Sequence, residues 1–204
     1  MQHIEFHVEE ESMRALLDVL LPRIAPSLSF KVYAYQGKPD MLRKLKNRML
    51  GYKRWLPEYY KIFILIDRDK DDCTALKQEL ENIASLSGLN TKTRSGSSDC
   101  SWQVVNRIVI EELEAWYFGD WEAVINAYPE AAPKPRRQVA NPDGLSDTWE
   151  QFERIMKRKG YFKSGLRKIE AARNIGAYIE PERQKSPSFI AFYDAIKRIV
   201  DCDV

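Results

Sequence analysis

The chain has 204 residues, of which 44% are hydrophobic and 30% are charged, and its formal net charge is +2. These values suit one soluble globular domain with a small appendage. No apolar run approaches the length of a membrane span and the N-terminus has no signal-peptide pattern, so we expect a cytoplasmic protein without a membrane partner. Three separated cysteines without a C-x-x-C pair (Cys73, Cys100 and Cys202) predict reduced thiols and argue against a disulfide framework or a zinc site.

The first two thirds of the chain alternate predicted strands and helices. Short apolar or alternating segments predict strands over residues 4–8, 30–35, 61–66 and 102–110, and they allow a further strand over 89–94. Helical spacing of apolar residues predicts helices over 13–22, over 41–51 with Gly51 as the end, over 73–85, from Glu111 onward and over 120–127. Residues 52–60 are expected to be a connector. This order favours an α/β fold with a parallel or mixed, doubly wound sheet.

The last third of the chain has a different character. Four prolines and several cations between Pro129 and Gly144 predict a long basic loop. Amphipathic helices are predicted over 148–159, after the segment 162–169, and over 188–200. We therefore expect an α/β core over residues 1–128 and a basic loop with a helical extension over residues 129–204, packed on that core.

Acidic residues follow three of the predicted strands. They are Glu9–Glu11, then Asp67 and Asp69 with Asp71 and Asp72, and then Glu111 and Glu112 with Glu114. In a parallel sheet these groups would meet at the carboxyl edge, where α/β proteins bind their ligands, and strand alternation would place Asp67 and Asp69 on one side. Oxygen ligands without His or Cys favour Mg²⁺ or Mn²⁺, which activates water and holds a phosphodiester.

Simpler interpretations exist for several of these residues. An acid directly after a strand often caps the next helix, and this applies to Glu10, Glu11, Asp71, Asp72 and Glu111. The segment 95–98 resembles a phosphate loop only loosely, because it lacks the glycine-lysine pattern of that motif. His7 is more typical of a structural residue than of a ligand or base, and Trp116 and Tyr117 are more typical of a core than of a platform for bases.

Basic residues cluster in two places. Residues 38–61 contain eight Lys or Arg against two acids, which is typical of a surface that meets a polyanion or of an ordinary solvated helix face. Lys163, Arg167 and Lys168 form the second group. We predict that Lys38, Lys163, Arg167 and Lys168 contact a nucleic-acid backbone, with ordinary surface as the alternative.

Four segments together resemble the DUF4276 family, a bacterial and phage-associated group related to the Toprim fold. They are Val8–Ser12, Ile66–Asp69, Ile110–Trp116 and Tyr161–Glu170, of which the Glu-Glu-Leu-Glu-Ala-Trp stretch is the most specific. The resemblance covers nearly the whole chain. It implies a Toprim-like core, which is a small Rossmann-like parallel sheet between helices.

By this resemblance, Glu9 is the glutamate after the first strand, and Asp67 and Asp69 are the Asp-x-Asp pair that binds Mg²⁺ or Mn²⁺. Glu10 stands where Toprim proteins usually have glycine, and no nucleophilic tyrosine domain is evident, which argues against a topoisomerase. We therefore expect a metal-dependent nuclease in which Glu112 or Glu114 orients water or a second metal.

The alternative is a non-catalytic subunit that binds an ATPase or nucleic acid. The resemblance also suggests a defence or mobile-element context with an ABC- or OLD-type ATPase encoded nearby. A homodimer is left open as the oligomeric state.

Overall fold

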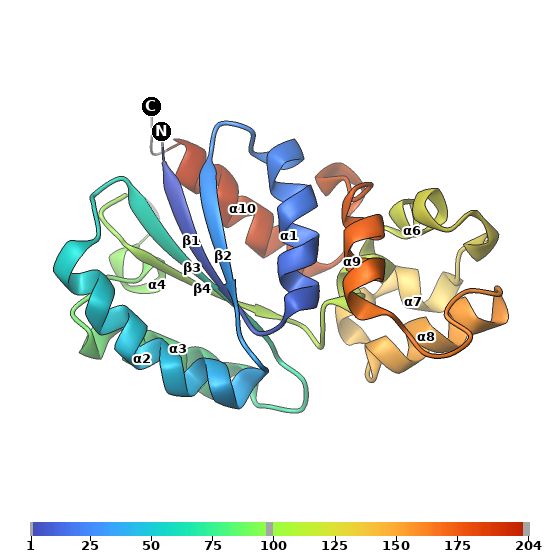
Figure 1. Ribbon diagram of the computed structural model, residues 1–204, viewed down its shortest axis with the longest axis horizontal. Helices are drawn as coiled ribbons and strands as arrows, with labels where there is room; N and C mark the ends of the chain where they lie inside the picture. The colour runs from blue at the N-terminus through green and yellow to red at the C-terminus, as the bar shows by residue number, and fades with distance from the viewer. Residues whose placement is uncertain (1, 97–99, 202–204) are drawn as a thin grey trace.

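The centre of the protein is a four-stranded parallel sheet with the strand order β2-β1-β3-β4 (Figure 1). The computed structural model describes residues 2–96 and 100–201, apart from the side chain of residue 138. Neighbouring strands are parallel throughout, so the predicted α/β fold is confirmed and its sheet is parallel, in a Rossmann-like arrangement. The strands are β1 (His3–Val8), β2 (Ser29–Ala34), β3 (Tyr60–Asp67) and β4 (Val104–Val109).

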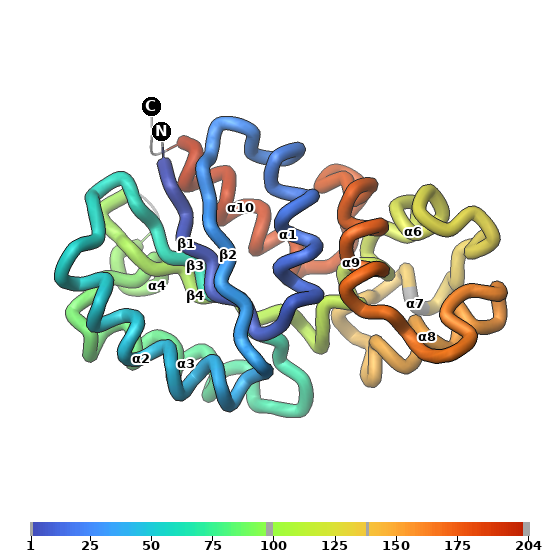
Figure 2. The backbone as a smooth tube through the Cα atoms, viewed as in Figure 1, coloured from blue at the N-terminus to red at the C-terminus, as the bar shows by residue number. Residues whose placement is uncertain are grey.

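Both faces of the sheet are covered by helices, because the central strand β3 is apolar on both sides. On one face, Ile62, Ile64 and Ile66 of β3 pack with α2 (Lys38–Trp55) and α3 (Cys73–Leu86). On the other face, Phe63 and Leu65 pack with α1 (Glu11–Ile24) and α10 (Pro187–Asp201). Figures 1 and 2 show α10 returning from the far end of the chain to lie against the sheet.

The remaining helices lie mostly beside the sheet, past the carboxyl ends of its strands (Figure 1). Among them α5 is entirely buried, and α9 packs on α1 through Gly176, where an added Cβ would lie 2.9 Å from Val19. No helix in the described part of the chain is both long and apolar enough to cross a membrane. These helices are α4 (Lys92–Ser95), α5 (Glu114–Gly119), α6 (Trp121–Ala127), α7 (Arg136–Ala140), α8 (Thr148–Arg158) and α9 (Lys168–Gly176), with 3-10 turns η1 (Pro129–Ala131), η2 (Pro142–Gly144) and η3 (Pro181–Arg183).

Helix α2 is longer than its sequence pattern predicted. It begins at Lys38 and continues through Gly51 to Trp55, so the predicted end at Gly51 and the predicted connector over residues 52–55 are wrong. The reason is Tyr52, which lies three residues after the buried Met49 and extends the same buried face. A helix-interior glycine costs only about 1 kcal/mol, which this burial offsets.

Other predictions also need correction. Residues 89–94 form no strand; Thr91 makes a single bridge to Val104 and α4 follows. The helix expected from Glu111 begins at Glu114, and the predicted loop over 129–144 contains η1, α7 and η2. Cys73 is a free thiol but Cys100 is disulfide-bonded, so the expectation of reduced thiols is wrong for Cys100. Residues 97 and 98 of the loose phosphate-loop resemblance lie outside the described residues, as does Cys202.

Candidate functional site

The acidic residues gather where β1, β3 and β4 end. Glu9 directly follows β1, Asp67 is the last residue of β3, and Glu114 begins α5 a few residues after β4. We use the name carboxylate cluster for Glu9, Glu10, Asp67, Asp69 and Glu114, because, besides burial, the charges of the other four all raise the pKa of Asp67. The register of the parallel sheet creates this convergence, because it brings the three strand ends to one edge.

Glu9 ties the first strand to the two loops beside it. Its Oε1 accepts a hydrogen bond from the backbone N–H of Lys38 at 3.0 Å, and its Oε2 accepts one from the N–H of Asp67 at 3.2 Å. Burial, followed by the charge of Asp69, raises the pKa of Glu9 to about 7. A carboxyl group with this pKa exchanges its proton near neutral pH.

Asp67 is the most strongly perturbed carboxylate of the site. Only 7% of the residue is exposed, and its carboxylate has no hydrogen-bond partner within residues 2–96 and 100–201. Burial, with the charges of Glu9 and Glu114, raises the pKa of Asp67 well above its ordinary value. The hydroxyl of Tyr117 is buried in the same field of Glu114 and Asp67, and it too has no partner in the described structure.

Asp69 lies outside strand β3, so strand alternation does not determine its direction. Its backbone adopts φ +50°, in the left-handed region that aspartate tolerates better than most residues. Its carboxylate accepts a hydrogen bond from the Lys38 Nζ at 2.8 Å, and Asp71 accepts a second from the same ammonium at 2.7 Å. The carbonyl of Arg68 completes the set at 3.1 Å. Lys38, which we predicted to meet nucleic acid, therefore occupies a cation position among these oxygens.

The glutamates that follow β4 have separate tasks. Glu111 forms an ion pair with Arg68. Glu112 accepts hydrogen bonds from the Thr148 hydroxyl at 2.8 Å and from the Trp149 N–H at 3.0 Å, and thereby caps the start of α8. One Glu112 oxygen is thus engaged in holding α8. Glu114 is the member of this group that joins the carboxylate cluster.

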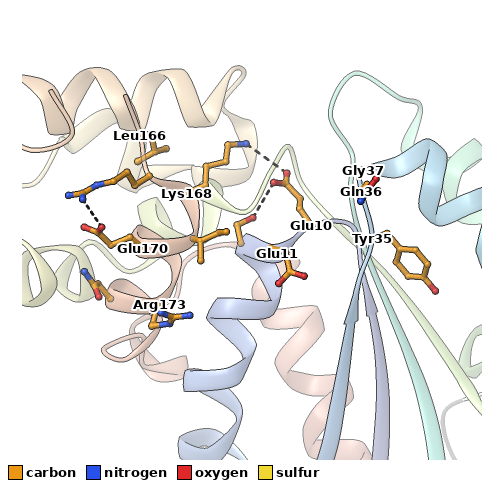
Figure 3. Close-up of a pocket in the computed structure, with 13 residues that line it drawn as sticks. Glu10, Glu11, Tyr35, Gln36, Gly37, Leu166, Lys168, Glu170 and Arg173 are labelled. Carbon is orange, nitrogen blue, oxygen red and sulfur yellow. Dashed lines mark hydrogen bonds and ion pairs between the residues drawn. The ribbon is translucent and has the colours of Figure 1, made fainter. Parts of the chain in front are cut away.

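Glu114 and Glu10 share one cation, Lys168. Glu114 is only 2% exposed, and burial raises its pKa to about 7 although the charge of Lys168 acts in the opposite direction. Figure 3 shows Lys168 extending from the start of α9 toward Glu10, at 3.8 Å. Burial lowers the pKa of Lys168, but the charges of Glu114, Glu10 and Glu112 outweigh it and the net shift is upward.

The other two predicted contacts to nucleic acid lie farther out. Lys163 is exposed in the turn before α9, and Arg167 is an exposed side chain paired with Glu170 at 3.0 Å. Arg167 and Lys168 line an open pocket of 860 Å³ between the start of α1 and α9 (Figure 3). The structure thus brings Lys38 and Lys168 to the carboxylate cluster but not Lys163 or Arg167.

The donor chemistry of the site suits a hard divalent cation. The buried Asp67 carboxylate and the buried, unpartnered Tyr117 hydroxyl are groups that a hydrated cation would satisfy, and Lys38 shows that Asp69 already accepts a cation. The side chains are not arranged as a ligand set, because no three His, Cys, Asp or Glu of the described residues are placed to hold one metal ion together. Glu9, Asp67 and Asp69 could hold such an ion only if Asp69 were free of Lys38.

Two members of the site escaped the sequence prediction. Glu10 was expected at the acidic edge or as a helix cap but not as a site residue, and Tyr117 was expected in the core and not as a platform for bases, although Tyr117 also places an unpartnered hydroxyl in the field of two carboxylates. The signal for Glu10 was its place in the acidic run after β1. Nothing in the sequence marked Tyr117, because its role depends on how α5 is rotated.

Comparison with known proteins identifies one family. No curated protein and no solved structure matches the chain. The model of the family described as "Domain of unknown function (DUF4276)" matches residues 8–197. Because this match spans nearly all of the chain, the protein belongs to the DUF4276 family.

Proposed function

We propose that this protein is a Mg²⁺- or Mn²⁺-dependent nuclease of the Toprim type that hydrolyses phosphodiester bonds in nucleic acid. The observation that carries the proposal is the carboxylate cluster, in which acids from three strand ends, the buried Asp67 and Glu114 and the partly buried Glu9, lie within electrostatic range of one another. Buried like charges destabilise a fold, so such a cluster is typical of a site that receives a cation.

The chain's own residues divide the work as follows. Glu9, Asp67 and Asp69 would hold the metal, which when bound neutralises phosphodiester charge and activates water. Glu114, with a pKa of about 7, is suited to accept a proton at neutral pH. Glu112 is less suited to that role because it caps α8. Lys168, beside Glu10, is positioned to attract a phosphate.

One observation favours a second candidate, a non-catalytic subunit that binds nucleic acid or an ATPase. The ammonium of Lys38 already satisfies Asp69 and Asp71 without a metal. If that arrangement is permanent, the cluster is a structural ion network. An ABC- or OLD-type ATPase partner and a defence context are part of our proposal on the strength of the family resemblance alone.

Cleavage of a panel of plasmid, linear DNA and RNA with Mg²⁺ or Mn²⁺ tests the enzyme. The decisive comparison is wild type against Asp67→Asn/Asp69→Asn, with Glu130→Gln/Glu182→Gln as a control that removes two exposed carboxylates elsewhere. We expect metal-dependent cutting that only the first variant loses. Absence of cutting, also after addition of the neighbouring gene product, would leave the binding subunit. Cutting that survives in the first variant would place the activity elsewhere.

A further inference from the structure

The outer face of α2 is a strongly basic surface with few internal partners. Its exposed cations are Arg43, Lys44, Lys46, Arg48, Lys53 and Arg54, against the single acid Asp40. Asp40 pairs with Arg43 and Lys44, whereas Lys46 and Arg54 have no ion-pair partner in the described structure. The face therefore carries charge that the fold does not neutralise.

An exposed aromatic platform stands at the end of this face. Trp55, the last residue of α2, is 56% exposed, and Tyr59 nearby is 53% exposed. Both rings pack against other aromatic rings. The ring centroid of Trp55 lies 5.4 Å from that of Tyr52 and 6.0 Å from that of Tyr60. The ring centroid of Tyr59 lies 5.0 Å from that of Tyr60. Aromatic rings held in place and open to solvent are platforms on which unpaired bases stack.

Helix α2 connects this platform to the carboxylate cluster. It starts at Lys38, whose N–H binds Glu9, and Figure 1 shows it running from the carboxyl ends of the strands back toward their amino ends. Its 18 residues span about 27 Å. At about 3.4 Å per nucleotide of a stacked strand, that length accommodates about eight nucleotides.

We propose that the outer face of α2, from its first turn to Trp55, binds a single strand of nucleic acid and leads it to the carboxylate cluster. The cations contact phosphates, and Trp55 stacks on a base. The direction of the strand rests on the proposed function, but the binding itself does not. The assignment makes single strands or strand ends the substrate class and a duplex the poorer ligand, because a paired base offers Trp55 no free face.

A second copy of the chain is a poorer occupant of this surface. The stretch of the chain richest in acids lies between residues 108 and 130, and most of its acids are engaged within their own chain. Glu111 binds Arg68, Glu112 caps α8, and Asp120 and Glu122 pair with Arg183 and Lys134.

Binding measured in EDTA tests the cations without cleavage. A labelled 12-nucleotide strand is titrated by fluorescence anisotropy between 50 and 200 mM salt, with Lys46→Ala/Arg54→Ala compared with Arg136→Ala/Arg137→Ala, which also removes two exposed cations. Each phosphate contact to a single strand contributes about 0.7 to the logarithmic salt slope. We expect the α2 variant to lower that slope by about 1.4 and to weaken the Kd at 0.1 M salt roughly tenfold or more. An equal loss in the control, or no loss in either variant, would overturn the assignment.

Trp55→Ala tests the platform, with Trp55→Phe as the conservative variant. We expect roughly tenfold weaker binding of the single strand, little change for a 12-base-pair duplex, and recovery in Trp55→Phe. Equal losses for strand and duplex would refute stacking, as would binding of anionic phosphatidylserine vesicles with no binding of oligonucleotides. If the strand binds along α2 but no metal supports cleavage, the proposed nuclease fails and this inference stands. If all α2 variants cleave as well as wild type, the proposed nuclease stands and the inference of strand binding along α2 fails.

Discussion

Replacing Glu114 with glutamine should stabilise the protein at alkaline pH. Glu114 is almost fully buried, and its folded-state pKa of about 7 exceeds the ordinary value of 4.5. The folded state therefore binds the proton more tightly than the unfolded state between these two values. For an acid, this sign means that the free energy of unfolding falls as the pH rises from 4.5 to 7. Glutamine keeps the shape of the protonated acid and cannot ionise.

The size of the effect follows from the shift. The difference of about 2.5 pKa units corresponds to about 3 kcal/mol, since one unit is 1.36 kcal/mol. The stabilisation by Glu114→Gln should be close to zero at pH 4, where the Glu114 carboxyl of the wild type is mostly protonated in both the folded and the unfolded state. It should approach about 3 kcal/mol at pH 8, less any loss of the attraction to Lys168.

Urea unfolding at pH 4, 6 and 8 measures this difference, with the exposed Glu182→Gln as the control. The control should change the free energy of unfolding by the same small amount at each pH. A Glu114→Gln variant that is equally or less stable than wild type at pH 8 would refute the reasoning. It would mean that Glu114 is ionised and well paired with Lys168 in the folded protein.

Three further changes test other parts of the structure. His7 is buried between the hydroxyls of Tyr35 and Tyr52, and burial lowers its pKa to about 3. The free energy of unfolding of wild type should therefore fall by up to about 5 kcal/mol as the pH falls from 6.5 to 3. His7→Gln should remove that part of the pH dependence in urea titrations. Arg183→Ala should cost about 3 kcal/mol in urea unfolding, because it strips the 1%-exposed Asp120 of two hydrogen bonds of 2.9 Å. Lys38→Ala should enlarge the rise in Tm on adding Mn²⁺, since it frees Asp69; an unchanged rise would exclude competition between the ammonium and the metal.

The sequence predicted the fold and the edge at which the acids meet. Both inferences need only the periodicity of short apolar runs and the rule that parallel strands end at one edge, and Asp67 at the end of β3 satisfies both. The C-terminal end of α2 was harder to predict, because the burial of Tyr52 outweighs the local signal of Gly51 for a helix end.

The distribution of roles within the site was beyond reach of the sequence. Glu112 and Glu114 are two residues apart, yet one caps α8 and the other is buried, because the start of α5 decides which side chain turns inward. Arg167 and Lys168 are adjacent, and only Lys168 approaches the carboxylates. The contact of Lys38 with Asp69 depends on a left-handed turn at a non-glycine residue, which no periodicity predicts.

The packing of α9 on α1 also has a consequence for the order in which the site is completed during synthesis. The carboxylates belong to the first 114 residues, but Lys168 arrives on α9, which docks through Gly176 against Leu16 and Val19. While α9 is still unsynthesised, a nascent chain carries these acids without that cation. While α10 is unsynthesised, Phe63 of β3 also lacks Phe192, whose ring centroid lies 5.5 Å from its own in the folded protein. Translation must therefore pass α9, which ends at Gly176, before Lys168 can balance the charge of these acids.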